Sequence, residues 1–390
     1  MSKFKRQVRN NMTETSTTSS SGKKNRFPFS VRFEPRLADN PWWLSPLLSL
    51  GAVLVALIIG AIILVMVGSD PWKTYAHIAD ASFGSLGVFS DTLVMATPLI
   101  LVGLACALAF RMRLWNIGAE GQLFIGAFGA SAVVLIPLLP DKAPAWLFII
   151  TMVGAGMLCG AIWGLIPGIL KAFFNVNEVI STLMLNYIAI SWNNFFIFAV
   201  WTEGGFQQSR QFPRNAWLPR LSDLGSQFPI FRGLTTHLGL VFGVIAAIII
   251  WLILYRSKWG YEIRLIGDNP EAARYAGISI RRNTVLVMLL SGALAGLAGM
   301  SQISGVVHRL QGSISSGYGF TGIIIAWLSK LNPLVVILVS VLFGALTLAG
   351  REIQPSGVPK LIQGIILVCL ISSDYLLRYR VRIVRQAEEL

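Results

Sequence analysis

The sequence predicts an all-α, polytopic membrane protein with about ten transmembrane helices and with its N and C termini in the cytoplasm. Of its 390 residues, 54% are hydrophobic and only 13% are charged, whereas about 25% of the residues of a soluble protein are charged. Several apolar stretches reach the roughly 20 residues that a helix needs to cross a bilayer. Residues 47–67 carry no charge, and 238–255 and 331–349 are nearly as apolar. We therefore expect a multi-pass protein of the cell membrane.

Hydropathy and loop charge place the transmembrane segments at roughly 45–67, 92–110, 117–137, 146–170, 178–200, 237–255, 284–306, 314–329, 331–349 and 359–377. An even number of spans agrees with two termini on the same side. The eighth segment is short and rich in Gly and Ser at its start. It could be a half-helix or a re-entrant segment, which is tolerated only where it lines protein or a water-filled cavity.

The net charge of +14 reflects topology in this interpretation and does not indicate a nucleic-acid partner. Most of the 32 Lys and Arg residues cluster in 1–41, 256–282 and 378–385 and at the ends of alternate apolar segments. Cytoplasmic loops of membrane proteins carry an excess of Lys and Arg. The distribution therefore places these regions, and both termini, in the cytoplasm.

Three regions follow along the chain. Residues 1–41 are basic and rich in Ser and Thr, which is typical of a disordered tail. Residues 42–380 are expected to form the transmembrane domain, with a cytoplasmic loop at 256–283. Residues 381–390 are expected to form a C-terminal cytoplasmic tail.

Glycines recur at helical spacing in two of the apolar segments: Gly156, Gly160, Gly164 and Gly168 in the fourth, and Gly292 and Gly296 in the seventh. Small residues let helix backbones approach closely in lipid, so we expect both rows to be packing surfaces. A faint likeness joins 93–110 to 286–300, two stretches that would start on opposite sides of the membrane, as inverted repeats do.

Polar side chains inside apolar segments are costly, and they face the bundle interior or a water-filled path. Asn116 and Glu120 lie four residues apart and so share one helix face. A second group, on the fifth segment, spans only about 80° of the helix circumference and consists of Glu178, Thr182, Asn186 and Asn193. Two interpretations stay open: interhelical hydrogen bonds that fix the bundle, or a path for a polar solute.

Three further residues complete the candidate solute contacts. Tyr187 follows Asn186 in the fifth segment, and Gln311 and Tyr318 lie in a polar run before the short eighth segment. Amides and hydroxyls can form hydrogen bonds with a polar solute, and an aromatic face can stack on a flat ring.

The chain contains no phosphate-binding G-x-x-x-x-G-K-[ST] loop, no H-E-x-x-H and no C-x-x-C. Its three histidines are far apart and form no evident catalytic group with a nucleophile. We therefore expect no catalytic residue, no metal site and no cofactor in this chain. Uphill transport would need energy from a partner or from an ion gradient.

The cytoplasmic loop contains the stretch NPEAARYAGISIRRN at 269–283. Asn269-Pro270 predicts a turn and a helix start, with Glu271 near the positive end of that helix. Gly277 can end it. The pattern predicts a short helix suited to docking, with small side chains at Ala272 and Ala273 that could enter a groove.

Glu271-Ala272-Ala273 followed by Gly277 matches the core of the EAA loop of ABC importer permeases. Together with GYEIRLIGDNPEAARYAGI at 260–278, the stretches LWNIGAEGQLFIGAFGA at 114–130 and NEVISTLMLNYIA at 177–189 resemble the branch for branched-chain amino acids, simple sugars and nucleosides. Over residues 45–380 the pattern is most similar to nucleoside (guanosine-type) permease subunits.

This resemblance implies a permease subunit of an ATP-binding cassette importer that forms the translocation path for nucleosides. A separate ATP-binding subunit would hold ATP and Mg, and it would bind the loop residues Asn269, Pro270, Glu271, Ala272, Ala273, Arg274 and Gly277. The resemblance also implies a second permease subunit, identical or homologous, and an extracytoplasmic solute-binding protein, for which the outer loop 201–236 is a candidate contact.

Two kinds of alternative remain. The same permease type could carry simple sugars or branched-chain amino acids, because a sugar path would need much the same polar groups. An ion-coupled secondary transporter belongs to another class. It would be expected to hold a buried Asp or Glu near the middle of the membrane, and it gives the EAA-like loop no role.

Overall fold

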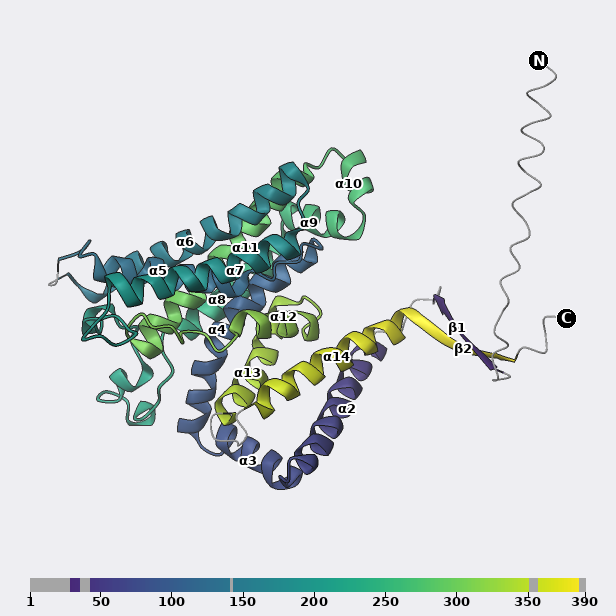
Figure 1. The fold of residues 1–390 in the computed structure, drawn as a ribbon, viewed down its shortest axis with the longest axis horizontal. Coiled ribbons are helices and arrows are strands. Elements are labelled where there is room, and N and C mark those ends of the chain that lie inside the picture. Colours follow the sequence, from purple (N-terminus) through teal and green to yellow (C-terminus); the bar gives the residue numbers. More distant parts are fainter. Residues whose placement is uncertain (1–28, 36–42, 141–142, 351–356, 386–390) are drawn as a thin grey trace, which may run out of the picture. The chain divides into compact units, whose positions relative to one another are not determined.

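The computed structural model describes residues 29–35, 43–140, 143–350 and 357–385, and within them the chain is predominantly helical (Figure 1). The larger helices are α2 (Leu44–Met66), α4 (Leu86–Arg111), α5 (Ala119–Leu135), α6 (Ala145–Phe174), α7 (Glu178–Phe195), α8 (Gly239–Arg256), α11 (Ile280–Gln302), α13 (Pro333–Ala349) and α14 (Val358–Arg378). The predicted all-α fold class is confirmed.

Each of the ten predicted apolar segments coincides with a helix in the described residues. Six helices are long and apolar enough to cross a membrane: Leu47–Met66, Leu86–Arg111, Ala145–Phe174, Glu178–Val200, Gly239–Arg256 and Ile280–Val307. Four apolar helices are shorter: Ala119–Leu135, Tyr318–Leu328, Pro333–Ala349 and Lys360–Ser373. The eighth segment is α12 (Tyr318–Leu328), which has only 11 residues, so its predicted shortness is confirmed.

Several shorter elements complete the chain. The amphipathic helix α3 (Pro71–Phe83) was not predicted, and α9 (Lys258–Asp268) and α10 (Pro270–Tyr275) form the loop between α8 and α11. Two π-helical segments extend α7 and α11, η1 (Phe196–Val200) and η5 (Ile303–Val307). Three 3₁₀ turns lie in the predicted outer loop: η2 (Arg214–Ala216), η3 (Leu221–Leu224) and η4 (Pro229–Phe231).

Strand β1 (Phe29–Pro35) pairs with β2 (Tyr379–Arg385) in an antiparallel, two-stranded sheet. The register sets Val31 opposite Ile383. Apolar and polar residues alternate along β1 and along β2 as far as Ile383, which is the sequence pattern of a strand. This sheet belongs to a unit of its own, 1–48 with 372–390. The structure thus forms strands within the two stretches that were predicted as tails. The remainder of those tails lies outside the described residues.

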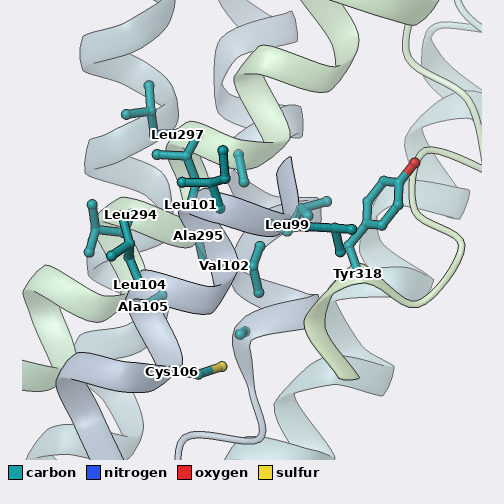
Figure 2. Packing of buried hydrophobic residues seen from close by; sticks show 14 of the residues in the cluster. Leu99, Leu101, Val102, Leu104, Ala105, Cys106, Leu294, Ala295, Leu297 and Tyr318 are labelled. Atoms are coloured by element: carbon teal, nitrogen blue, oxygen red, sulfur yellow. The ribbon is translucent and has the colours of Figure 1, made fainter. Parts of the chain in front are cut away.

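The core of the other unit, 49–371, is built around α4 and α11. In an apolar 18-residue stretch of α4, 94% of the residues are buried, and in the corresponding stretch of α11, 78% are buried. A helix that is apolar on all sides, such as α4, is expected at the centre of a bundle. Figure 2 shows Leu101 and Leu104 of α4 among the same buried side chains as Leu294 and Leu297 of α11.

Glycines make the closest helix contacts in this core. A β-carbon at Gly160 of α6 would overlap the backbone carbonyl of Gly292 in α11, and one at Gly296 would overlap the carbonyl of Gly156. The prediction that both glycine rows are packing surfaces is confirmed. α5 joins the same contact, since a β-carbon at Gly126 would overlap the backbone of Gly296.

α4 and α11 run antiparallel. Ser291, at the middle of α11, donates a hydrogen bond to the carbonyl of Ala105, near the end of α4 (2.7 Å), whereas the later Leu297 lies beside the earlier Leu101 (Figure 2). Each of the two helices is followed by a non-helical segment, 112–118 or 308–317, and then by a shorter helix, α5 or α12. The shared order of long helix, non-helical segment and short helix agrees with the faint sequence likeness between 93–110 and 286–300. The two short helices, α5 and α12, meet at their starts.

Candidate functional site

A buried hydrogen-bond network precedes α5. The Asn116 side-chain amide donates to Gln122 Oε1 (2.9 Å) and to Ser291 Oγ (2.8 Å). Its carbonyl oxygen accepts from the backbone N–H of Gly118 (3.1 Å). The NH2 group and the carbonyl oxygen of this fully buried side chain therefore both have partners. Because the bonds join α5 to α11, Asn116 fixes the backbone just before α5.

The starts of α5 and α12 meet at Glu120. Its Oε2 accepts a hydrogen bond from the backbone N–H of Gly319 (2.6 Å), and Gly319 lies so close that a β-carbon on it would overlap the Glu120 backbone. This hydrogen bond and the close backbone contact hold the first turns of the two helices together.

The polar face predicted on α7 exists, because Glu178, Thr182, Asn186 and Asn193 are all buried. Asn186 binds the start of α5 twice: Oδ1 accepts from the N–H of Gly121 (2.8 Å) and Nδ2 donates to the carbonyl of Ile117 (2.9 Å). Thr182 donates to the carbonyl of Glu178 (2.6 Å). The inner part of the stripe therefore makes interhelical and local hydrogen bonds.

Glu178 also forms an ion pair with Lys171 across the turn between α6 and α7 (2.9 Å). This contact, together with its position in the first turn of α7, accounts for a buried carboxylate at a helix start.

The outer candidates are only partly brought together. Asn193 Nδ2 donates to the backbone carbonyl of Gln311 (3.3 Å), whereas Asn193 Oδ1 has no hydrogen-bond partner among the described residues. Tyr318 is buried, with its hydroxyl 3.9 Å from the sulfur of Met95. Tyr187 faces away from the stripe, and its side chain is 65% exposed.

A hollow of about 510 Å³, lined by both polar and apolar residues, lies between the start of α12 and α14. Its lining consists of Ser315, Ser316, Gly317, Phe320, Thr321, Ile324, Lys360, Gln363 and Gly364. Most of these residues were not among the sequence candidates. The available signal was a Lys and a Gln in the first turns of the last apolar segment, where ionisable and amide groups are unusual.

The cytoplasmic loop folds as two short helices. Asn269 ends α9 and starts α10, its Oδ1 accepting from the N–H groups of Glu271 and Ala272 (both 3.1 Å). Pro270 occupies the first turn, and Gly277 has a left-handed backbone (φ +75°). Both local predictions, a helix start at Asn269-Pro270 and a stop at Gly277, are confirmed.

The face that α10 presents differs from the expected one. Ala273 is fully buried, and Ala272 is half-buried, because α10 packs this side on its own chain. Ala273 is therefore not available to enter a groove of a partner. The exposed residues of α10 are Pro270, Glu271, Arg274 and Tyr275, and Tyr275 is 94% exposed.

Contacts on both sides hold this loop in place. The side chain of Asn283 at the start of α11 accepts from Trp259 Nε1 (2.7 Å) and donates to Glu262 Oε2 (2.9 Å), both on α9. At the other end of α9, Gly267 lies directly against the backbone of Arg111. The loop is thus a braced platform rather than a free connector.

Two buried histidines lie just outside the long helices, at the opposite end of α11 from this platform. The ring of His308 stacks on Trp217 at 3.6 Å, and Arg220 Nη2 lies 2.7 Å from His308 Nε2. Burial and the positive charge of Arg220 lower the pKa of both His237 and His308 to about 4. Both rings are therefore neutral near pH 7.

Comparison with known proteins places these features in a family. The family model for the branched-chain amino acid transport system / permease component matches residues 88–371. This chain belongs to that permease family. It is a multi-pass membrane protein and a permease subunit of the ABC importer type.

Several known permeases align with most of this chain. This chain is 34% identical to a glucose ABC transporter permease protein of Haloferax volcanii, over 90% of this chain and 94% of that protein. It is 35% identical to a guanosine ABC transporter permease protein of Bacillus subtilis, over 85% and 94%. A nucleoside ABC transporter permease protein of Lactococcus lactis is 32% identical, over 83% and 89%.

Proposed function

We propose that this permease forms the translocation path for nucleosides and is driven by a separate ATP-binding subunit that docks on α10. Two relatives of similar identity, 35% and 32%, are named as guanosine and nucleoside permeases. The guanosine permease is covered over 94% of its length. ATP and Mg would be held by the docking subunit, and this chain would contribute no catalytic group.

The observation that carries the docking proposal is the combination of a braced loop and an exposed aromatic side chain. Tyr275 is 94% exposed on a helix whose neighbours are fixed by Asn283 and Gly267. Tyr is enriched among the residues that dominate binding energy at protein interfaces. Glu271 and Arg274 flank it and supply charges of both signs. The remaining proposed partners are a second permease subunit, an extracytoplasmic solute-binding protein at 201–236, and membrane lipid.

Sugar transport is the second candidate, because the glucose permease relative is 34% identical over 90% of this chain. Identity alone does not separate the two substrate classes, since these values differ by a single percentage point. Branched-chain amino acids have only the family description in their favour. The ion-coupled alternative loses its basis, because the family consists of ABC permeases.

Co-purification tests the docking proposal. The tagged permease is solubilised gently from its native membrane, and the proteins that come with it are identified by mass spectrometry. We expect an ATP-binding subunit to co-purify with the wild type. It should also co-purify with the control Tyr187→Ala, which removes an exposed tyrosine on α7, outside the cytoplasmic loop. Tyr275→Ala should lower recovery of that subunit by about tenfold or more, as for an interface residue of about 2 kcal/mol. Equal recovery with all three proteins would refute docking through α10.

A further inference from the structure

We propose that the hollow between α12 and α14 binds the transported solute, and that its lining selects a neutral solute with a flat ring and many hydrogen-bond acceptors, as in a nucleoside. The inference rests on the proposed function and assigns residues to it. Small-molecule sites occupy about 300–1,000 Å³, and the hollow, at about 510 Å³, lies within that range.

The depth of the hollow follows from the short α12. Its 11 residues extend about 17 Å, roughly half of a hydrocarbon core of about 30 Å. Its far end is fixed, because Trp327 stacks on Trp115 at 5.7 Å and Trp115 lies 5.3 Å from Phe110, next to the end of α4. The near end of α12, where the hollow opens, is therefore well inside the bundle.

Polar groups at that depth need a polar environment. Ser316 and Lys360 are exposed in the isolated subunit, although they line a hollow between two apolar helices. Hydroxyl and ammonium groups are unfavourable against lipid tails and mark solute or ion pathways in membrane proteins. We infer that this side of the hollow faces water or the solute rather than lipid.

The lining offers several hydrogen-bond donors to a solute. Lys360 supplies an ammonium group and Ser316 a hydroxyl. Gln363 uses its carbonyl oxygen to accept from Thr321 (3.3 Å), while its amide nitrogen makes no hydrogen bond within the described residues. A solute rich in acceptors, such as ribose oxygens and the carbonyl and ring nitrogens of a base, would complement these groups.

The lining also distinguishes between solute classes. No Asp or Glu lines the hollow directly. The nearby Glu120 accepts from Gly319 and interacts with Ser315 and Lys360, so its carboxyl group is already engaged and would not be free to pair with the ammonium group of an amino acid. Phe320 is 47% exposed and borders the hollow, and it offers an aromatic face to a flat base. A free sugar would use the donors without that planar contact.

Uptake of radiolabelled guanosine by cells that express the complete importer tests the site. Phe320→Ala should raise the half-saturating concentration by about tenfold, the order expected for the loss of one base–aromatic stack, and Gln363→Leu should act in the same direction. The matched control is Phe198→Ala, an exposed phenylalanine in η1 at the end of α7. It should leave uptake at the wild-type level. Wild-type kinetics in the two hollow variants would overturn the inference.

A labelling experiment reads the site directly. Ser316→Cys should react with a water-soluble maleimide, and guanosine should slow that reaction, whereas leucine should not. The control is Ser85→Cys, an exposed position just before α4 and outside the proposed partner contacts, and guanosine should leave its labelling rate unchanged. Unprotected labelling of Ser316→Cys in a permease that takes up guanosine would refute the site but not the proposed function. If the wild type takes up glucose and no guanosine, the nucleoside function and the solute class both fail.

Discussion

At the scale of single residues, buried polar side chains in this permease act mainly as fixed points for the backbone. Asn116 bonds Gln122 and Ser291, and Asn186 bonds the start of α5. A buried amide left without partners costs roughly 1–3 kcal/mol, so these bonds set the bundle geometry. The sequence identified both residues, because polar groups stand out in apolar helices. It could not identify their partners, since Ser291 lies 175 positions from Asn116.

The two buried histidines predict how stability depends on pH. The folded protein holds the pKa of His237 at about 4, whereas an unfolded His has a pKa near 6.5. Between these values the unfolded state binds more protons, so stability falls as the pH drops from about 6.5 toward 4 and is fully present above 6.5. For His237 the slope is up to about 1.4 kcal/mol per pH unit.

Thermal unfolding of the detergent-solubilised permease between pH 7.5 and pH 5 measures this effect. His237→Gln should flatten the fall in melting temperature over that range. His77→Gln removes an exposed histidine of α3 and should leave the slope unchanged. A melting temperature that is constant from pH 7.5 to pH 5 would contradict the burial of two neutral rings.

At the scale of elements, the contact of α6 with α11 depends on the absence of side chains. Gly160→Ala would place a methyl group against the Gly292 backbone, whereas a β-carbon at Gly154, on the same helix, would have nothing within 4 Å. We expect Gly160→Ala to destabilise the protein by about 1–3 kcal/mol, as overpacking does, and Gly154→Ala to be neutral. The melting temperatures of the two variants test this prediction. Equal values would contradict the close contact between α6 and α11 at Gly160.

Local signals predicted most elements, and tertiary contacts explain what they missed. The start of α10 at Asn269-Pro270 and its stop at Gly277 follow from capping and left-handed glycine geometry. The burial of Ala273 does not, because it depends on how α10 packs against other parts of the chain. The alternating pattern of β1 and β2 was present in the sequence, but a strand needs a partner, and these two are separated by almost the whole chain.

At the scale of the whole molecule, the order of the ten apolar segments was predictable from hydropathy and charge. The meeting of α5 and α12 at Glu120 was not, because nothing in either segment specifies the other. The hollow at the start of α12 was missed for the same reason, since Thr321 and Gln363 are 42 positions apart. Three parts of this permease would act together in transport: the packed core, the hollow between α12 and α14, and the loop between α8 and α11, which contacts the end of α4.

ATP-driven uptake tests the coupling of this permease through α10 most directly. The permease, co-purified with its partners, is reconstituted into liposomes that contain ATP and Mg in the lumen, with the solute-binding protein outside and all ion gradients collapsed. We predict guanosine uptake that requires luminal ATP and that falls by about tenfold or more with Tyr275→Ala, as expected for the loss of an interface residue of about 2 kcal/mol. Uptake that proceeds without ATP and follows an imposed ion gradient would contradict ATP-driven coupling.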